Sequence, residues 1–358
     1  MKLTKAVFLC ACGVAISSAN AQSGEVKLYG RVNGGLQYVN NIPNGSGGTN
    51  HRYAFSSSDF GFSWWGITGS EDLGDGLRAV FKLESPFVTG TGALPVPDTI
   101  FTRHSYVGLQ HPKLGSLWLG RTMSLADDTG WYIDPMGEQM TGVANLAGGR
   151  AWGPRINTIT YNSPRWDAFS FRLQAAPGEI AGSNSAKRLL SASAAYERED
   201  IKVYAVIEDL RDSNGKLSTL YNNSRFWMLG ANYKLGDLKL FGGYQRIQTD
   251  EDATIADPTN PAAATRSNQA WAGAAYNVTP LLSVQGGVYH VKLNRDGGSA
   301  TLAALGSNYY LSKRTILYAT VGSVKNKGAA AFPAITYQPG PLAGTSQQGT
   351  YIGMMHNF

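Results

Sequence analysis

The feature that most constrains the fold is an alternation of apolar and polar residues along a segment near the N-terminus. Successive side chains of a β-strand point to opposite faces, so alternate residues share a face. The segment is longer than the about five or six residues usual for a strand in a globular sheet. One of its faces carries no charge. That face consists of Val26, Leu28, Gly30, Val32, Gly34, Leu36 and Tyr38, and the other of Glu25, Lys27, Tyr29, Arg31, Asn33, Gly35 and Gln37.

Segments of this kind recur along the chain, joined in turn by tight turns and by long connections rich in Gly, Asn, Asp, Pro and Ala. Gly236-Asp237 is one of the turns, and 250–268 is one of the connections. Alternating short and long connections over an even number of strands are typical of a bacterial outer-membrane barrel, so we expect about sixteen strands. After the first, these are 61–72, 77–85, 100–110, 115–122, 156–162, 169–175, 188–197, 201–209, 225–235, 238–248, 269–277, 281–293, 302–311, 315–324 and 349–358.

The alternatives are a soluble β-sandwich, a β-helix or a propeller. Sandwich strands are shorter, with turns about every 8–12 residues, whereas one strand and its connection take about 21 residues here. No short repeat of the solenoid or propeller kind is visible. Closure also removes the unpaired strand edges that lipid cannot solvate. We therefore predict an all-β fold, a 16-stranded antiparallel transmembrane β-barrel.

The first residues have the pattern of a secretory signal peptide. Lys2 and Lys5 precede the apolar run 6–16, and Ala19-Asn20-Ala21 matches a cleavage site. A membrane anchor is the competing interpretation, but the run is far short of the about 20 residues that a spanning helix needs. We predict a signal peptide over 1–21 and a barrel over 22–358, located in the outer membrane.

Both cysteines, Cys10 and Cys12, lie in this leader. A lipoprotein acylated at Cys12 is an alternative, although its apolar region would be short. Otherwise the exported chain lacks cysteine, which excludes disulfides and thiol chemistry. The formal net charge of +6 is small and dispersed, so we expect no nucleic-acid partner.

Six strings of the mature sequence are informative in this order. They begin at Val26 (VKLYGRV), Gly69 (GSEDLGDGLRA), Arg103 (RHSYVGL), Leu119 (LGR), Asn157 (NTITYNSP) and Tyr310 (YLSKRTILY). With them the chain resembles one family, the trimeric general porins of β-proteobacteria and neisserial bacteria, over essentially the whole mature length. The resemblance implies a sixteen-stranded homotrimeric diffusion channel, surrounded by outer-membrane lipids and lipopolysaccharide, with no cofactor. The last strand, which ends at Phe358, resembles the signal read by the barrel-assembly machinery.

The resemblance also implies that the third long loop, 123–154, folds inward as a constriction. A barrel of this size leaves an aqueous channel wide enough to need one. The alternative is a solvated surface loop. If the loop does fold inward, it would present four carboxylates to the channel, those of Asp127, Asp128, Asp134 and Glu138.

The opposite wall is expected to be basic. The alternation points four cations inward, because an Arg facing lipid would cost about 2–4 kcal/mol at mid-membrane. Three further arginines lie near the constriction in sequence, on strands whose facing is ambiguous. Charged rings of this kind set ion selectivity. The first group is Arg31, Arg78, Lys82 and Arg172, and the second is Arg103, Arg121 and Arg155.

Four positions of lumen-facing parity depart from the resembled family: Trp64, Thr68, Trp118 and Met355. The wall has lost positive charge and gained two indoles. We therefore hypothesise a shift from anion preference towards neutral or aromatic solutes. The alternative is that the tryptophans merely sit at the barrel rim.

An enzymatic barrel is the main rival function, but the sequence lacks the context of a known catalytic motif. A structural barrel with a plugged lumen is another alternative. We see no separate plug domain before the barrel, which argues against this alternative. The spacing of Asp250-Glu251-Asp252 does not fit a calcium loop, so we expect no metal site. The histidines are scattered, at His51, His104, His111, His290 and His356.

Overall fold

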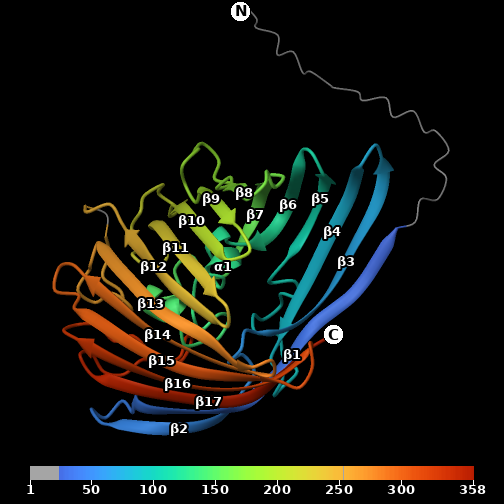
Figure 1. Cartoon of the computed structure of the whole chain (residues 1–358). Coiled ribbons are helices and arrows are strands. Elements are labelled where there is room, and N and C mark those ends of the chain that lie inside the picture. Colours follow the sequence, from blue (N-terminus) through green and yellow to red (C-terminus); the bar gives the residue numbers. More distant parts are fainter. Residues whose placement is uncertain (1–23, 253) are drawn as a thin grey trace, which may run out of the picture.

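The computed structural model describes residues 24–252 and 254–358, which form one antiparallel sheet that closes on itself (Figure 1). The predicted signal peptide 1–21 lies outside these residues. The elements are β1 (Glu25–Pro43), β2 (Thr49–Ser56), β3 (Ser63–Gly74), β4 (Leu77–Phe87), β5 (Ser105–His111), β6 (Gly115–Met123), α1 (Leu125–Gly130), η1 (Val143–Ala147), β7 (Pro154–Asn162), β8 (Phe169–Ala176), β9 (Leu189–Glu197), β10 (Ile201–Leu210), β11 (Arg225–Leu235), β12 (Leu238–Gln248), β13 (Arg266–Thr279), β14 (Leu282–Leu293), β15 (Ser299–Tyr310), β16 (Thr315–Lys327) and β17 (Ser346–Asn357).

The barrel has sixteen strands, because β2 and β3 are two parts of one. Both pair with β1, β2 through Gly35↔Ser56 and β3 through Arg31↔Trp64. From β3 on, each strand pairs with the next in sequence, and β17 pairs with β1. The closure is completed by two backbone hydrogen bonds between Gly30 and Phe358, of 3.0 and 3.1 Å. The predicted fold class is confirmed.

Two differences from the predicted strands have a clear cause. β2 was not expected, because Thr49–Ser56 begins with polar residues on both faces. The strand expected at 100 begins only at Ser105. Before it the chain turns towards Glu84, where the backbone of Glu84 and His104 is hydrogen bonded at 2.8 Å. Contacts with distant residues decide both boundaries.

The break between β2 and β3 turns the chain towards the segment that follows β6. Asp59 is buried there and accepts hydrogen bonds from Gln37 Nε2 and Ser56 Oγ, each at 2.8 Å. Its carbonyl oxygen accepts from the Met140 N–H at 2.9 Å. Gly61, at φ +71°, allows the chain to return to the barrel wall. The break therefore links the wall to the segment inside it.

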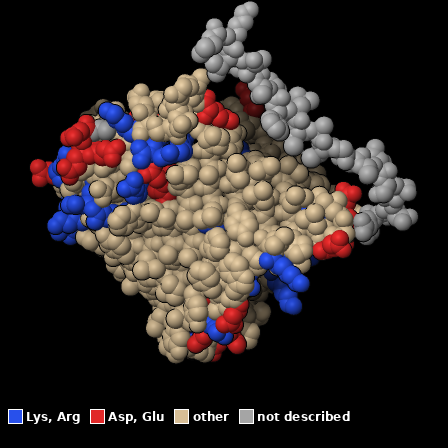
Figure 2. Space-filling view, turned by 90° about the horizontal axis from the view of Figure 1, so that it is seen from above, with Lys and Arg blue, Asp and Glu red and all other residues tan. Residues whose placement is uncertain are grey.

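The two faces of the wall differ in polarity. Large apolar side chains such as Leu36 and Leu229 are exposed on the outside. Buried amides such as Gln37, Gln174 and Gln245 occupy the inner face. Figure 2 shows a broad outer band almost without charge, with Lys, Arg, Asp and Glu gathered near its ends. This distribution suits a wall with lipid outside and water inside.

Among the described residues, no helix is long and apolar enough to cross a membrane.

The facing of the side chains can be tested with one substitution on each side of the wall. Leu229→Arg places a cation on the outer face and should cost about 2–4 kcal/mol of folding free energy if the site is near mid-membrane. Ser170→Arg, on the inner face of β8, should cost far less, because its side chain borders a lumen cavity. Urea unfolding in lipid vesicles measures both. Equal losses would contradict the facing.

Candidate functional site

The candidate site is the lumen, together with the segment 124–153 that connects β6 to β7. This segment contains α1 and η1 and is drawn within the ring of strands (Figure 1). It is hydrogen bonded to inward side chains of β11 and β13–β15. Trp271 Nε1 donates to Ile133 O at 2.8 Å, and Asn232 Nδ2 to Tyr132 O at 2.6 Å. The segment therefore covers the inner wall on that side.

Inward glycines let the segment approach the wall closely. A Cβ at Gly230 would lie 2.5 Å from Cδ1 of Ile133, and one at Gly322 would lie 2.5 Å from Cγ2 of Thr141. On β13, β14 and β15, a Cβ added at three further inward glycines would lie close to Pro135 or Met136. They are Gly273, Gly287 and Gly306. These five residues form a groove that we call the glycine groove, and it accounts for five of the 43 glycines of the chain.

Two of the four expected loop carboxylates do not face the channel. Asp127 and Asp134 are buried. Asp127 accepts hydrogen bonds from Trp131 Nε1 and the Gly153 N–H, at 2.8 and 2.7 Å. Asp134 accepts from the Tyr289 hydroxyl and from two backbone N–H groups of its own segment. These acids hold the segment together, a role that depends on partners far away in sequence.

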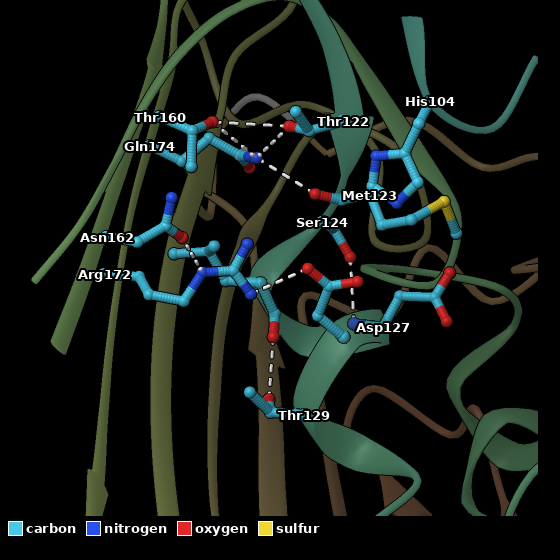
Figure 3. Close-up of polar contacts among 12 residues, drawn as sticks. His104, Thr122, Met123, Ser124, Asp127, Thr129, Thr160, Asn162, Arg172 and Gln174 are labelled. Atoms are coloured by element: carbon cyan, nitrogen blue, oxygen red, sulfur yellow. Dashed lines mark hydrogen bonds and ion pairs between the residues drawn. The ribbon is translucent and has the colours of Figure 1, made fainter. Parts of the chain in front are cut away.

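The other two loop carboxylates meet the wall. Asp128 forms an ion pair with Arg172 at 2.7 Å, and Arg172 also donates to Asn162 Oδ1 at 2.6 Å. Figure 3 shows Arg172 reaching from the wall towards α1. Glu138 pairs with Arg31. Their carboxylates are 26% and 41% exposed, so both pairs border open space.

A second ionic cluster holds the C-terminal end of the segment 124–153 in place. The sequence did not predict it. Arg150, almost fully buried, donates to Glu208 on β10 and to Ser224. Arg155, one of the expected wall cations, pairs with the same carboxylate at 2.9 Å. The sequence signal was the inward parity of Glu208, a charge near the end of β10.

A third cluster surrounds Glu84 on β4. Arg103 Nε lies 3.1 Å from its carboxylate and Lys82 Nζ lies 3.8 Å from it. The Tyr29 hydroxyl donates to it at 2.7 Å. The structure thus brings Lys82 and Arg103 together on the inner wall.

Two expected wall arginines lie elsewhere. Arg78 is exposed beside the β3–β4 turn and donates to Ser70 Oγ, so it is separate from the clusters around the segment. Arg121 pairs with Ser105 in the outward parity of β5 and β6, and its guanidinium reaches Thr102 O at 3.4 Å. The sequence left the facing of Arg121 ambiguous, and the structure places it next to a register shift between Gly120 and Thr122.

The four departures have different surroundings. Trp64 and Trp118 are half-buried inside the barrel, next to Arg103 and Arg172, rather than at the rim. Thr68 donates to Phe81 O at 3.0 Å. Met355 is buried in an apolar cluster with Tyr318 and Tyr351, so it does not line open space.

Most cations of the exposed wall are balanced by carboxylates. Apart from the buried Arg150 and Arg155, five of them lie beside a carboxylate, whereas Lys239 on β12 lies 5.0 Å from the Phe241 ring centroid and forms no ion pair among the described residues. A fifth pair, Lys202 with Glu197 at 3.8 Å, lies on β10 and β9. Five cations thus face four carboxylates: Arg31, Lys82, Arg103, Arg172 and Lys202 against Glu84, Asp128, Glu138 and Glu197. Within 24–252 and 254–358, no group of three or more His, Cys, Asp or Glu residues could hold a metal ion.

A closed sixteen-stranded barrel with an apolar exterior and a polar lumen defines the class of transmembrane β-barrel channels. The comparisons agree. A family model described as Gram-negative porin matches residues 6–329. The chain is 28% identical to outer membrane porin protein 32 of Delftia acidovorans, over 99% of this chain and all of that protein.

An outer membrane porin of Bordetella pertussis is also 28% identical, over 89% of this chain and 94% of its own length. Among solved structures, an anion-selective porin from Comamonas acidovorans has a TM-score of 0.79 at 25% identity and covers 94% of this chain and all of that structure. The chain therefore belongs to the Gram-negative porin family. It forms a water-filled channel in the outer membrane.

The glycine groove yields one prediction. Gly287→Val should push Pro135 off the wall, because a Cβ there would already lie 2.7 Å from its Cγ. Overpacking of this kind costs about 1–3 kcal/mol. Single-channel recording should show altered and noisier conductance. Gly242→Val is the control, since a Cβ there meets nothing nearer than 3.7 Å. Conductance like that of the unmodified protein in both variants would refute the groove.

The buried acids yield a second prediction. Burial raises the pKa of Asp127 and the pKa of Asp134 to about 6, although each accepts several hydrogen bonds. The docked segment thus binds protons more tightly than the undocked one. Its stability is greatest below the ordinary pKa and falls as the pH rises through 6.

Backbone hydrogen exchange over 125–147, corrected for intrinsic rates, should show stronger protection at pH 5 than at pH 7.5. Asp127→Asn with Asp134→Asn should flatten the difference, since neither side chain then ionises. Protection that rises with pH in the unmodified protein would show the sign to be wrong.

Proposed function

We propose that the segment 124–153 narrows the channel, and that solutes pass between this segment and the inner faces of β3–β10. The observation that carries the proposal is the uneven docking of the segment. On one side it packs closely into the glycine groove and is hydrogen bonded to side chains such as Trp271, whereas it meets β8 and β10 through single side chains such as Asp128 and Arg150. On the other side, inward residues such as Trp64 and Trp118 stay half-buried.

The transport we propose is passive diffusion of ions and small hydrophilic solutes, with no reaction. A porin of Comamonas acidovorans in the comparison is described as anion-selective. In this chain five exposed cations are matched by four carboxylates. The field along the wall is thus weak, which supports a small anion preference and a shift towards neutral or aromatic solutes.

We also propose that the working unit is a homotrimer, as in the trimer form of OmpT from Vibrio cholerae, whose fold is similar (TM-score 0.65, 15% identity). Cleavage after Ala21 and recognition of the strand ending at Phe358 by the barrel-assembly machinery belong to the same proposal. Outer-membrane lipids and lipopolysaccharide would contact the apolar outer band (Figure 2).

Planar-bilayer recording tests the channel and its assembly. Detergent-extracted protein should insert as a unit with three equal conductance steps, and cross-linking should give a trimer. A silent protein with hydrolytic activity would overturn the diffusion channel. A single step with a monomeric mass would overturn the trimer alone.

A charge variant tests the boundary of the channel. Glu138→Gln with Asp128→Asn should raise the ratio of anion to cation permeability several-fold, because each uncompensated charge contributes about 1 kcal/mol at 4 Å in water. The reversal potential in a KCl gradient measures this ratio. Glu71→Gln, near the β3–β4 turn, is the matched control. An unchanged reversal potential in the double variant would place the conducting path elsewhere.

A further inference from the structure

We propose that the open side of the lumen carries a binding track for aromatic carboxylates. The inference rests on the proposed function of the lumen as a diffusion channel. It goes further by naming the class of solute that the wall retains.

The track is built from three pairs of aromatic rings. Tyr29 and Trp64, on β1 and β3, have ring centroids 5.1 Å apart in an edge-to-face arrangement. Tyr106 and Trp118, on β5 and β6, are stacked at 4.6 Å. The third pair joins the segment to the wall, because Tyr132 belongs to the segment 124–153 and stacks at 5.6 Å on Tyr204 of β10. The pairs therefore follow the open part of the wall and end at the segment.

Each pair has a cation beside one of its rings. The Arg103 guanidinium carbon lies 5.4 Å from the Trp64 ring centroid, and that of Arg172 lies 5.9 Å from Trp118. Lys202 Nζ lies 5.5 Å from the ring centroid of Tyr132. A cation within about 6 Å of a ring centroid is attracted by the ring's negative face. An aromatic ring and a cation therefore lie side by side at three places on the inner wall.

The cations keep capacity for a further anion. Arg103 reaches Glu84 through Nε, and its two terminal nitrogens have no hydrogen-bond acceptor among the described residues. Lys202 is only loosely paired, 3.8 Å from Glu197 with its side chain 36% exposed. A planar guanidinium presents a fork of N–H donors that matches a carboxylate.

The third pair borders a cavity of about 400 Å³ between α1 and strands β8–β10. This volume lies in the range of small-molecule sites, about 300–1,000 Å³. The residues that matter for recognition are Asp128, Tyr132, Arg172, Glu197, Lys202 and Tyr204. A single-ring acid could stack on the exposed Tyr132 ring while its carboxylate meets Lys202 or Arg172.

The chemistry of the wall selects among solutes. An inorganic anion uses only cations that are already matched by carboxylates, and a neutral aromatic leaves the cations without a new partner. A cationic aromatic meets a like charge beside each ring. Only an aromatic anion interacts with both the aromatic rings and the cation beside them. Ring stacking contributes about 0.5–1.5 kcal/mol, which is roughly a 2- to 12-fold difference in affinity.

The test is block of the KCl current by three solutes of similar size. Benzoate carries both the ring and the charge, cyclohexanecarboxylate only the charge, and benzamide only the ring. We expect benzoate to block with roughly 2- to 12-fold higher affinity than cyclohexanecarboxylate, and benzamide to block least. Porin-free bilayers correct for partition of the solutes into lipid.

Trp64→Leu with Trp118→Leu should reduce the preference for benzoate while KCl conductance persists, and adding Tyr132→Leu, which removes the ring of the third pair, should abolish it. Trp227→Leu is the matched control, because that indole is exposed on the outer face of β11 and should leave the preference intact. Equal block by benzoate and cyclohexanecarboxylate in the unmodified channel would overturn the track, even if the variants failed to fold. So would an undiminished preference in a conducting triple variant.

These results are distinguishable from failure of the proposed function. A conducting channel without solute preference refutes only the track. A protein that never conducts KCl refutes the channel, and the track with it.

Discussion

The structure depends on one constraint, that every backbone N–H and C=O group within the hydrocarbon layer needs a partner in the protein. Pairing of each barrel strand with the next meets this need everywhere except where the chain begins and ends. There β1 pairs with β17, and the hydrogen bonds between Gly30 and Phe358 close the ring. The last residue therefore completes the sheet, and a closed wall is the frame on which the lumen is built.

Closure creates a space too large for the wall's own side chains to fill. The segment 124–153 occupies part of it and packs most closely against β11 and β13–β16, because the glycines there leave room for its backbone and side chains. Asp134 and Arg150 fasten it by burying charges with partners on β14 and β10. Breaking such a buried pair is costly, which suits a segment that must keep one position in an aqueous channel.

On the other side the lumen remains open, and its chemistry is one of paired charges and rings. The ion pairs Arg31–Glu138 and Arg172–Asp128 join wall and segment, and in the channel that we propose they set the width of the passage as well as its field. Since most of the charge is compensated, recognition depends on what lies beside it. In this chain that is a set of aromatic rings, including the two indoles at positions 64 and 118.

The sequence by itself determined the barrel, its strand number and the facing of most wall residues, because alternation and turn spacing are local properties of the chain. Arg31, Lys82 and Arg172 could be oriented in this way. The facing of Arg121 stayed ambiguous in the sequence, and the structure places it in the outward parity of β6, beside a register shift. Local parity also could not reveal β2, whose place depends on pairing with β1.

Only the tertiary structure decided the roles of the charges. Asp127 and Asp128 are neighbours in sequence, yet one is buried within the segment and the other pairs with Arg172. Arg150 and Glu208 are 58 residues apart and meet in the interior. The role of a charged side chain depends on the residues around it. Those residues come from strands that only closure of the barrel brings together.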